Sequence, residues 1–560
     1  MSAKNFQSQV VYQIYVRSFY DSNGDGIGDL HGIIEKLPYL ASLGIGYIWL
    51  NPIFPSSNSD NGYDITDYCS IDPTFGTMED LEELIRLSSQ YDIGIILDMV
   101  FNHTSTEHPW FKKALSGDPH YKDYYFFQKS TGRPPTNWLS KFGGSAWTET
   151  NLENEYYLHL FSEKQADLNW KNPNVRLELY DILKFWIKKG ITGFRFDVIN
   201  LISKPDIFKD DDEGDGRRFY TDGVNVENYL KEMRNVIDEQ SPNRQLLLVG
   251  ELSSTTAEKS IPYSKEENKE LSMIFHFQHL KTDYDTADNK WSVSDVDYKK
   301  LKELFHEWQL HMVSHNAHDA LFWNNHDQPR ALTRFVSDNK DLYFQSAALL
   351  ASTIHFMYGT PYIYMGEEIG MISPEYESIS DYRDVETLNY YDILMKDGHS
   401  ETEVMNIIKK RSRDNGRSPM QWNFGKHAGF TTGTPWIHAA ASKGEINVVT
   451  EEQKSNGILA FYKHLISLRQ KYTLIQNGTY HPFLNDMENI IAYIRENEVQ
   501  YLLCINNYNN TSIQIEESRF FPYQSLEYTV LASNYFREHI DFNAALNLKP
   551  FETLVVLMHK

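Results

Sequence analysis

Short apolar runs rich in β-branched and aromatic residues recur along most of the chain, with longer amphipathic stretches between them. Such runs predict strands and such stretches predict helices. The predicted strands lie at 10–16, 45–54, 93–101, 193–199, 246–252, 271–277, 320–327 and 360–368. Helical patterns include 29–43, 78–91, 174–189 and 341–357. This alternation predicts an α/β fold with a parallel sheet, most simply a closed (β/α)8 TIM barrel formed by 1–103 and 174–478.

Three parts of the chain depart from the barrel pattern. Residues 104–173 are too many for a plain crossover connection and include aromatic, Gly-rich segments, so we expect an inserted subdomain B after the third strand. Residues 370–430 form a second excursion, after the eighth strand. From 479 to 560 the pattern changes to short alternating strands, which predicts a C-terminal antiparallel β-sandwich domain.

Composition narrows the classes of partner. The 560 residues include 53 Lys and Arg against 77 Asp and Glu, a net charge of −24 that argues against binding to nucleic acid or to anionic membranes. Cys69 and Cys504 stand too far apart in the sequence to suggest a disulfide framework. The N-terminal sequence lacks the features of a secretory signal, and no segment of the sequence is apolar enough to span a membrane. We therefore expect a soluble cytoplasmic protein. The sequence indicates no oligomeric state.

Polar side chains stand at the ends of several predicted strands, the face where barrel enzymes place their chemistry. They are Asp98, Asn102, Asp197, Glu251, His326 and Asp327. Because no nucleophilic Ser or Cys motif competes with them, the carboxylates are the first candidates for chemistry.

Asp197 and Glu251 are suited to different roles. Arg195 lies two residues before Asp197, hence on the same face of the strand, and its guanidinium would keep the carboxylate ionised and oriented, as a nucleophile requires. Glu251 follows an apolar run, where poor solvation can raise the pKa of a carboxyl and let it act as a general acid. Such a pair is the minimum for retaining glycoside hydrolysis. Asp327 is better suited to binding sugar hydroxyls.

Four of these segments resemble the signature regions of the α-amylase superfamily: DMVFNH (98–103), GFRFD (193–197), VGE (249–251) and NNHD (324–327). QADLNW (165–170) is similar to a fifth region in the oligo-1,6-glucosidase branch. The resemblance covers nearly the whole chain. It implies a retaining, exo-acting α-glucosidic enzyme that takes a small sugar substrate and needs no organic cofactor.

The resemblance also implies roles for residues. Asp197 would be the nucleophile, Glu251 the acid/base and Asp327 the transition-state stabiliser. The sugar in the cleavage subsite would be bound by His103, Phe161, Gln165, Arg195 and His326. Asp60 and Tyr63, with Arg417 of RDNGRSPMQW, would close the pocket at the non-reducing end. An Arg–Asp pair is a rigid clamp for the outer hydroxyls of one terminal sugar.

The segment DSNGDGIGD places oxygen-bearing side chains at alternating positions around a glycine turn, an arrangement that can wrap a hard cation. Enzymes of this branch often have calcium here, which implies a structural site away from the catalytic groups. The expected ligands are Asp21, Asn23, Asp25, the backbone carbonyl of Ile27, and Asp29. The alternative is a polar turn without metal.

Within the branch, several stretches look most like trehalose-6-phosphate hydrolases, and LSST after Glu251 discriminates best from α-1,6-glucosidases. A protein of charge −24 that accepts a phosphorylated sugar must place cations near its entrance. The candidates are Arg217, Arg218, Lys281 and Lys290, each of which taken alone would be a surface charge.

Other interpretations stay open at this point. An oligo-1,6-glucosidase or dextran glucosidase shares the fold and the catalytic groups, and Val198 after the nucleophile is compatible with that activity. Sucrose isomerases and glucosyl transferases use the same covalent intermediate. A non-catalytic interaction barrel is a further alternative, against which the three acids argue.

Overall fold

The computed structural model describes residues 5–286, 289–336, 339–440 and 445–560. Its centre is a barrel of eight parallel strands in the order β11-β10-β9-β3-β2-β1-β13-β12. A parallel bridge between Ile274 of β11 and Asp319 next to β12 closes the ring. All eight predicted strands are therefore confirmed, each shorter than the apolar run that predicted it. The strands are β1 (Val11–Ile14), β2 (Tyr47–Leu50), β3 (Gly94–Met99), β9 (Gly193–Phe196), β10 (Leu247–Glu251), β11 (Met273–Phe275), β12 (Ala320–Leu321) and β13 (Thr360–Tyr364).

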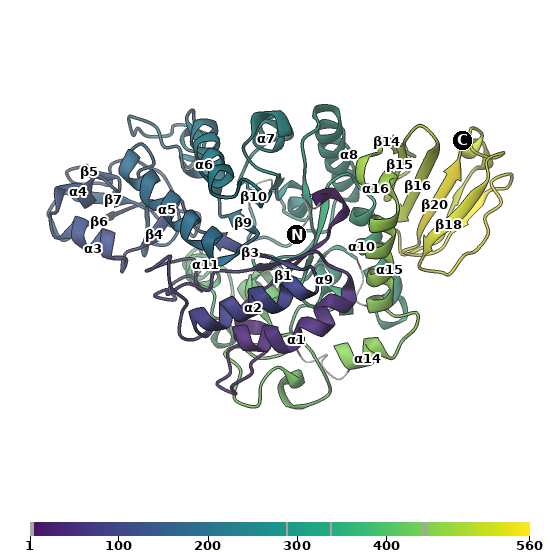
Figure 1. Cartoon of the computed structure of the whole chain (residues 1–560), viewed down its shortest axis with the longest axis horizontal. Helices are drawn as coiled ribbons and strands as arrows, with labels where there is room; N and C mark the ends of the chain where they lie inside the picture. The colour runs from purple at the N-terminus through teal and green to yellow at the C-terminus, as the bar shows by residue number, and fades with distance from the viewer. Residues whose placement is uncertain (1–4, 287–288, 337–338, 441–444) are drawn as a thin grey trace.

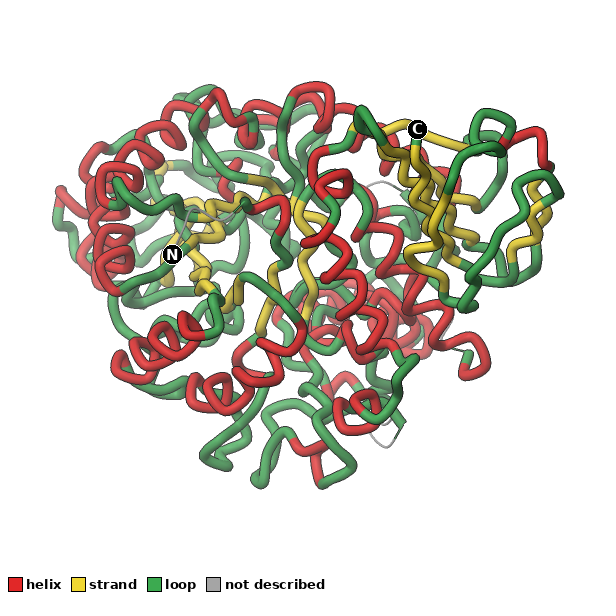
Figure 2. Tube along the Cα trace, turned by 45° about the vertical axis from the view of Figure 1, so that its right-hand side comes forward, coloured by secondary structure: helices red, strands yellow, loops and turns green. Residues whose placement is uncertain are grey.

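Helices surround the barrel (Figures 1 and 2). The predicted helical patterns correspond to α1 (Leu30–Leu43), α2 (Met78–Gln90), α5 (Pro173–Lys189) and α10 (Tyr343–His355). Asp29 caps α1 and the Thr77–Asp80 capping box starts α2, so the caps fix where these helices begin. The other barrel helices are α6 (Val226–Gln240), α7 (Ala257–Ser264), α8 (Tyr298–His315), α9 (Ala331–Phe335), α14 (Val448–Glu452), α15 (Ile458–Lys471) and α16 (Thr473–Asn477).

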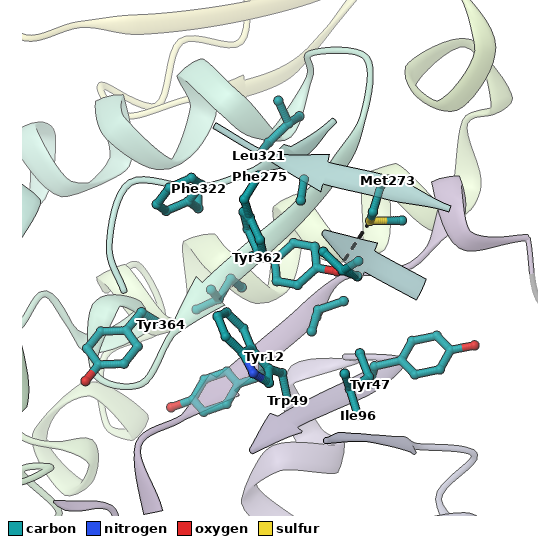
Figure 3. Close-up of a cluster of buried hydrophobic side chains, with 14 of the residues drawn as sticks. Tyr12, Tyr47, Trp49, Ile96, Met273, Phe275, Leu321, Phe322, Tyr362 and Tyr364 are labelled. Atoms are coloured by element: carbon teal, nitrogen blue, oxygen red, sulfur yellow. Dashed lines mark hydrogen bonds between the residues drawn. The ribbon is translucent and has the colours of Figure 1, made fainter. Parts of the chain in front are cut away.

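The barrel interior is filled by large side chains, many of them aromatic (Figure 3). Phe275 packs edge-on against Tyr362 with ring centroids 4.6 Å apart, and the Tyr362 hydroxyl lies 3.3 Å from the sulfur of Met273. The ring of Trp49 lies 5.5 Å from that of Phe275, so it belongs to the same packed group. The interior is thus a packed core that holds the strand ends in place.

Subdomain B leaves the barrel after β3 and extends to one side of it (Figure 1). Its first strand, β4 (His103–Ser105), pairs antiparallel with β8 (Gln165–Asp167), so the two ends of the insertion meet beside the barrel mouth. A small sheet in the order β5 (Phe127–Lys129), β7 (Glu155–Leu158), β6 (Trp147–Glu149) and the helices α3 (Pro109–Leu115) and α4 (Pro119–Lys122) complete it.

The excursion after β13 consists of α11 (Val385–Lys396), α12 (Glu401–Arg411) and the one-turn helix α13 (Asp414–Arg417). Its apolar side chains, among them Val404 and Ile408, form a small cluster together with Trp291 and Ile437. The excursion supplies the side chains of Glu386 and Arg413 to the barrel mouth.

The C-terminal domain has a five-stranded antiparallel sheet, which lies to the right of the barrel in Figure 1. Ile515 and Leu548 of a second, two-stranded sheet share its core, as expected for a small sandwich. Its strands are β14 (Thr479–Phe483), β15 (Ile490–Glu496), β16 (Gln500–Asn507), β20 (Thr553–His559) and β18 (Tyr528–Ser533), with β17 (Ile513–Ile515) and β19 (Leu546–Leu548) in the second sheet. Within the described residues, no helix combines the length and apolar character that crossing a membrane requires.

Candidate active site

The guanidinium of Arg195 is the centre of a buried cluster of carboxylates at the barrel mouth. Its Nη1 donates to Asp98 Oδ1 and to Asp197 Oδ1, both at 2.7 Å, and its Nη2 donates to Glu251 Oε2. Arg195 lies on β9 and Asp197 directly follows its last residue, and both side chains enter the same cluster, as period-two alternation predicted. Since one planar guanidinium contacts both Asp197 and Glu251, the two carboxyls lie close enough to flank a single glycosidic bond.

Asp98 was noted in the sequence only as a strand-end acid, and the structure gives it a clear function. Its Oδ2 accepts hydrogen bonds from the Tyr63 hydroxyl at 2.8 Å and from Trp49 Nε1 at 3.2 Å. With Arg195 on its other oxygen, this carboxylate is fully engaged and buried. Asp98 thus fixes Arg195 and Tyr63 and is not free for proton transfer.

Glu251 and Asp327 lie in different electrostatic surroundings. Burial raises the pKa of Glu251 well above its ordinary value, against the opposing effect of Arg195. For Asp327, burial acts in the same upward direction, but His326, Arg413 and Arg417 outweigh it and hold the pKa well below the ordinary value. The site therefore contains one carboxyl that favours its proton and one that stays ionised, as acid/base chemistry requires.

His103, Gln165 and Asp60 form one hydrogen-bonded group. Pairing of β4 with β8 puts Gln165 opposite Ser105, two positions from His103, and Gln165 Nε2 lies 3.1 Å from His103 Nε2. Gln165 Nε2 also donates to Asp60 Oδ2 at 3.1 Å. Burial raises the pKa of Asp60 to about 7 despite the nearby Arg413. Phe161 packs against the ring of His103 at 5.3 Å.

His326 is completely buried below Tyr63, with parallel rings 5.1 Å apart. Its Nδ1 lies 2.9 Å from Gln13 Nε2, and its Nε2 lies 3.1 Å from Asp327 Oδ2. Burial lowers the pKa of His326 to about 3, so the ring is neutral at physiological pH. Its contacts indicate that it orients Asp327.

The clamp at the closed end of the pocket involves a different arginine from the one expected. Arg413 Nη2 donates to Asp60 Oδ1 at 2.8 Å, whereas Arg417 is completely buried and donates to Asp327 Oδ1 at 3.1 Å and to the backbone oxygen of His326. Arg413 also donates through Nε to the buried Asp384 at 2.8 Å. The sequence analysis missed Arg413 and Asp384, although Arg413 begins the same RDNGRSPMQW stretch.

A cavity of about 230 Å³ lies above these groups. This volume is below the roughly 300–1,000 Å³ of pockets that enclose a drug-sized ligand, which suits a small sugar. The predicted residues in its wall are Asp60, Tyr63, His103, Phe161, Gln165, Asp197, Glu251, Lys281, Lys290 and Asp327. Further wall residues that the sequence analysis did not select include Lys141, Phe142, Ser253, Tyr284, Glu386 and Arg413.

The four candidate phosphate ligands are placed differently. Lys281 and Lys290 line the cavity, but Lys290 Nζ is paired with Glu386 Oε2 at 2.6 Å. Arg218 is outside the cavity wall and pairs with Asp211 at 2.7 Å and with Glu213 at 2.6 Å. Arg217 pairs with Asp215 at 2.5 Å. The structure thus brings Lys281 and Lys290 to the cavity and not Arg218.

The glycine-rich loop before α1 adopts a tight turn, since Gly26 has a positive φ of 97° and an added Cβ would collide with Thr434 O. Asp21 accepts backbone amide bonds from Gly24 and Gly26, both at 2.7 Å, and Asp29 accepts from Gly32 at 2.6 Å. Asn23 and Asp25 are exposed and cap the amides of Asp25 and Ile27. Among the described residues, no group of three or more His, Cys, Asp or Glu is placed to hold a metal ion. To bind an ion, the Asp oxygens would have to give up these hydrogen bonds from backbone amides and coordinate the cation instead.

The chain is similar to known enzymes over nearly its whole length. It is 45% identical over 559 residues to the trehalose-6-phosphate hydrolase of Bacillus subtilis (strain 168), which covers 99% of this chain and 98% of that protein. It is 44% identical over 565 residues to an oligo-1,6-glucosidase of Bacillus cereus, covering 99% of both.

A crystal structure of the trehalose-6-phosphate hydrolase of Bacillus licheniformis has the same fold, with a TM-score of 0.94 and 45% identity over 99% of this chain and 100% of that one. The family model described as Alpha amylase, catalytic domain, matches residues 13–478. The barrel, the carboxylate cluster and these similarities agree, and the chain belongs to the alpha-amylase family.

Proposed function

We propose that this protein is a retaining, exo-acting α-glucosidase that hydrolyses trehalose 6-phosphate to glucose and glucose 6-phosphate. The observation that carries the proposal is the Arg195 guanidinium that joins Asp197 and Glu251 at the floor of a small cavity. The similarity to trehalose-6-phosphate hydrolases supports the choice of substrate.

In the first step, a carboxylate oxygen of Asp197 attacks the anomeric carbon while the glycosidic bond breaks, and Glu251 gives its proton to the leaving oxygen. In the second step, a water molecule attacks the same carbon, Glu251 takes a proton from it, and Asp197 is released. Arg195 keeps the attacking oxygen oriented in both steps. The ionised Asp327 faces the reacting sugar and stabilises positive charge that develops on the ring.

The closed end of the cavity accounts for exo action. Arg413 and Asp60 form a charged clamp that can bind the outer hydroxyls of one terminal glucose, and Asp384 holds the clamp from behind. A longer chain could not pass this end. The cavity wall also contains lysine side chains, which are suited to a phosphorylated leaving sugar.

The test of the proposal is to compare hydrolysis of trehalose 6-phosphate with hydrolysis of isomaltose by the purified protein. We expect kcat/KM for trehalose 6-phosphate to be at least a hundred times higher. Asp197→Ala should abolish both activities, and a residual rate above about one part in a thousand would remove Asp197 as nucleophile.

The second candidate is an oligo-1,6-glucosidase, which the 44% identity to the Bacillus cereus enzyme and Val198 after the nucleophile favour. Preferential hydrolysis of isomaltose in the same experiment would establish it and overturn the phosphorylated substrate. A cytoplasmic location, as expected from the sequence, belongs to the same proposal, because a phosphorylated sugar arises inside cells.

We further propose that calcium binds the loop of Asp21, Asn23, Asp25, the Ile27 carbonyl and Asp29, and links it to the start of α1. The exposed oxygens of Asn23 and Asp25 support the proposal. Calcium should then raise the melting temperature by several degrees relative to protein treated with a chelator. Asp25→Ala should lose this difference, and identical melting of the unaltered protein in both conditions would contradict calcium binding.

A further inference from the structure

Lys141 is a cation in the cavity wall that comes from subdomain B. Its side chain crosses to the barrel, where Nζ donates to Ser253 Oγ at 3.0 Å, two residues after Glu251 in sequence. This contact joins the insertion to the segment that directly follows strand β10, in the wall of the cavity. Neither the family signatures nor the catalytic mechanism gives Lys141 a role.

Both ends of this contact are held in fixed positions. The Lys141 amide donates to Leu160 O at 2.8 Å, which ties the backbone to the segment next to Phe161. On the other side, Asn200 accepts from the Ser253 amide at 2.9 Å and donates to the Ser253 carbonyl at 3.0 Å. Because Asn200 lies three residues after the nucleophile, the Lys141 ammonium has a defined position relative to both catalytic acids.

Lys141 differs from the other cations near the cavity in its partners. Lys290 is neutralised by Glu386 and Arg218 by Asp211 and Glu213. Among the described residues, Lys141 has a hydroxyl and no carboxylate as hydrogen-bonding partner. Burial, then the charges of Arg217 and Lys281, lower the pKa of Lys141 to about 8. The carboxylates of Asp215 and Glu251 act in the opposite direction but do not outweigh these effects. An ammonium in such surroundings gains from an anionic ligand.

We propose that Lys141 is a specificity-determining residue that binds the substrate phosphate, and that it does so together with Lys281, whose side chain also lines the cavity. The inference rests on the proposed function and deepens it. It assigns the phosphate to the side of the cavity where Lys141 meets Ser253, and it excludes Arg218, which lies outside the wall. Lys141 interacts with phosphate as a compact point charge, and Ser253 Oγ adds a hydroxyl donor once the ligand replaces it as partner of Nζ.

A consequence concerns pH. The charged groups that act on Lys141 are Arg217 and Asp215 near η4 (Arg217–Phe219), Lys281 of η6 (Gln278–Lys281), and Glu251 of β10. A bound dianion favours the protonated ammonium, so binding is strong below the pKa of about 8 and weakens as pH rises through it. Uncharged glucosides should lack this dependence.

The test uses Lys141→Gln, measured on trehalose 6-phosphate and on p-nitrophenyl α-glucoside. We expect KM for the phosphorylated sugar to rise at least tenfold, and the ratio of kcat/KM for the two substrates to fall by a similar factor. Lys141→Arg, which keeps the charge, should recover part of the loss. Lys129→Gln is the matched control, because it removes an exposed charge of the same subdomain away from the cavity. Equal losses on both substrates, or no loss on either, would overturn the assignment.

Inhibition of aryl glucoside hydrolysis by glucose 6-phosphate separates this inference from the proposed function. If the unaltered enzyme fails to cleave trehalose 6-phosphate, the proposed substrate is wrong. If glucose 6-phosphate inhibits the unaltered enzyme and Lys141→Gln equally, the role of Lys141 is wrong whatever the substrate. The expected result is inhibition at least ten times weaker in Lys141→Gln, and in the unaltered enzyme weaker above pH 8 than below it.

Discussion

At the residue scale, the active site depends on one guanidinium with carboxylates on both sides. Arg195 contacts Asp98, Asp197 and Glu251, and almost nothing of its side chain is exposed. Asp98 accepts two further hydrogen bonds, from Tyr63 and Trp49, so the carboxylate that holds the guanidinium is itself fixed in place. Asp197 and Glu251 therefore have different roles because their surroundings differ, and not because one is Asp and the other Glu.

The raised pKa of Glu251 leads to a prediction about pH. Because burial lifts the pKa above its ordinary value, the protonated acid persists to higher pH, and activity should fall only as pH rises through that shifted pKa. Glu251→Gln cannot ionise and should lose this alkaline limb on isomaltose, an uncharged glucoside that does not depend on Lys141, with kcat/KM reduced by about 10²–10⁴-fold. A pH profile of kcat/KM measures both effects. An unchanged alkaline limb in the variant would assign the acid to another group.

A second prediction at this scale concerns the contribution of Lys204 to stability, although this residue does not line the cavity. Its Nζ lies 2.6 Å from both Asp167 Oδ2 and Asn102 Oδ1, and Asn102 Nδ2 lies 3.2 Å from His103 Nδ1. Lys204→Met should leave a buried carboxylate without its cation and destabilise the fold by about 3–5 kcal/mol. Denaturant unfolding measures the loss. Lys164→Met, which alters an exposed lysine of subdomain B, should change stability little, and equal effects of the two would contradict the role of the buried pair.

At the scale of elements, the one-turn helix α13 explains why sequence reasoning selected the wrong partner for Asp60. Arg413 and Arg417 stand one helical turn apart and both reach Asp327 and Asp384, but only Arg413 reaches Asp60. The partners are 353 residues apart in sequence. Which arginine faces the cavity depends on how the excursion packs on the barrel, and the local sequence does not contain that information.

The strands and insertions could be predicted, because each depends on local pattern. The apolar run 93–101 predicts β3, and the break in pattern after it predicts subdomain B. Lys141 was not predictable in this way, because its role follows from a contact with Ser253 across two separate segments. Among the four candidate phosphate ligands, the charge of Arg218 was visible in the sequence, but its neutralisation by Asp211 and Glu213 was not.

A prediction about substrate binding concerns Arg413 of the excursion. Arg413→Lys keeps the charge but cannot donate to Asp60, Asp327 and Asp384 at once, as the planar guanidinium does. We expect kcat/KM to fall by about 10- to 150-fold, the equivalent of losing roughly 1.5–3 kcal/mol of charged hydrogen bonding. Steady-state kinetics measure the change. Arg383→Lys alters an exposed arginine of the same excursion and should leave kcat/KM unchanged; similar losses in both variants would indicate a general effect on the excursion.

At the scale of the whole molecule, the C-terminal sheet is buried on both faces. On β16, Leu502 and Cys504 belong to the large core of the barrel, whereas Leu503 and Ile505 belong to the core between the two sheets of the domain. The Tyr493 hydroxyl also donates to the backbone oxygen of Thr353 in α10 at 2.8 Å. A sheet that shares one face with the barrel should unfold together with it.

Leu502→Ala and Leu503→Ala test this coupling as a matched pair, because the two side chains are neighbours in sequence, almost completely buried and on opposite faces of one strand. Each should cost about 2–5 kcal/mol. If barrel and sheet form one cooperative unit, both variants lower the temperature at which glucosidase activity is lost, and calorimetry shows a single transition for each. If instead Leu503→Ala melts the C-terminal sheet at a lower temperature while activity survives, the domains are independent. In that case, the apolar contact through Leu502 would not join them energetically, and the C-terminal domain could not be said to stabilise the active site.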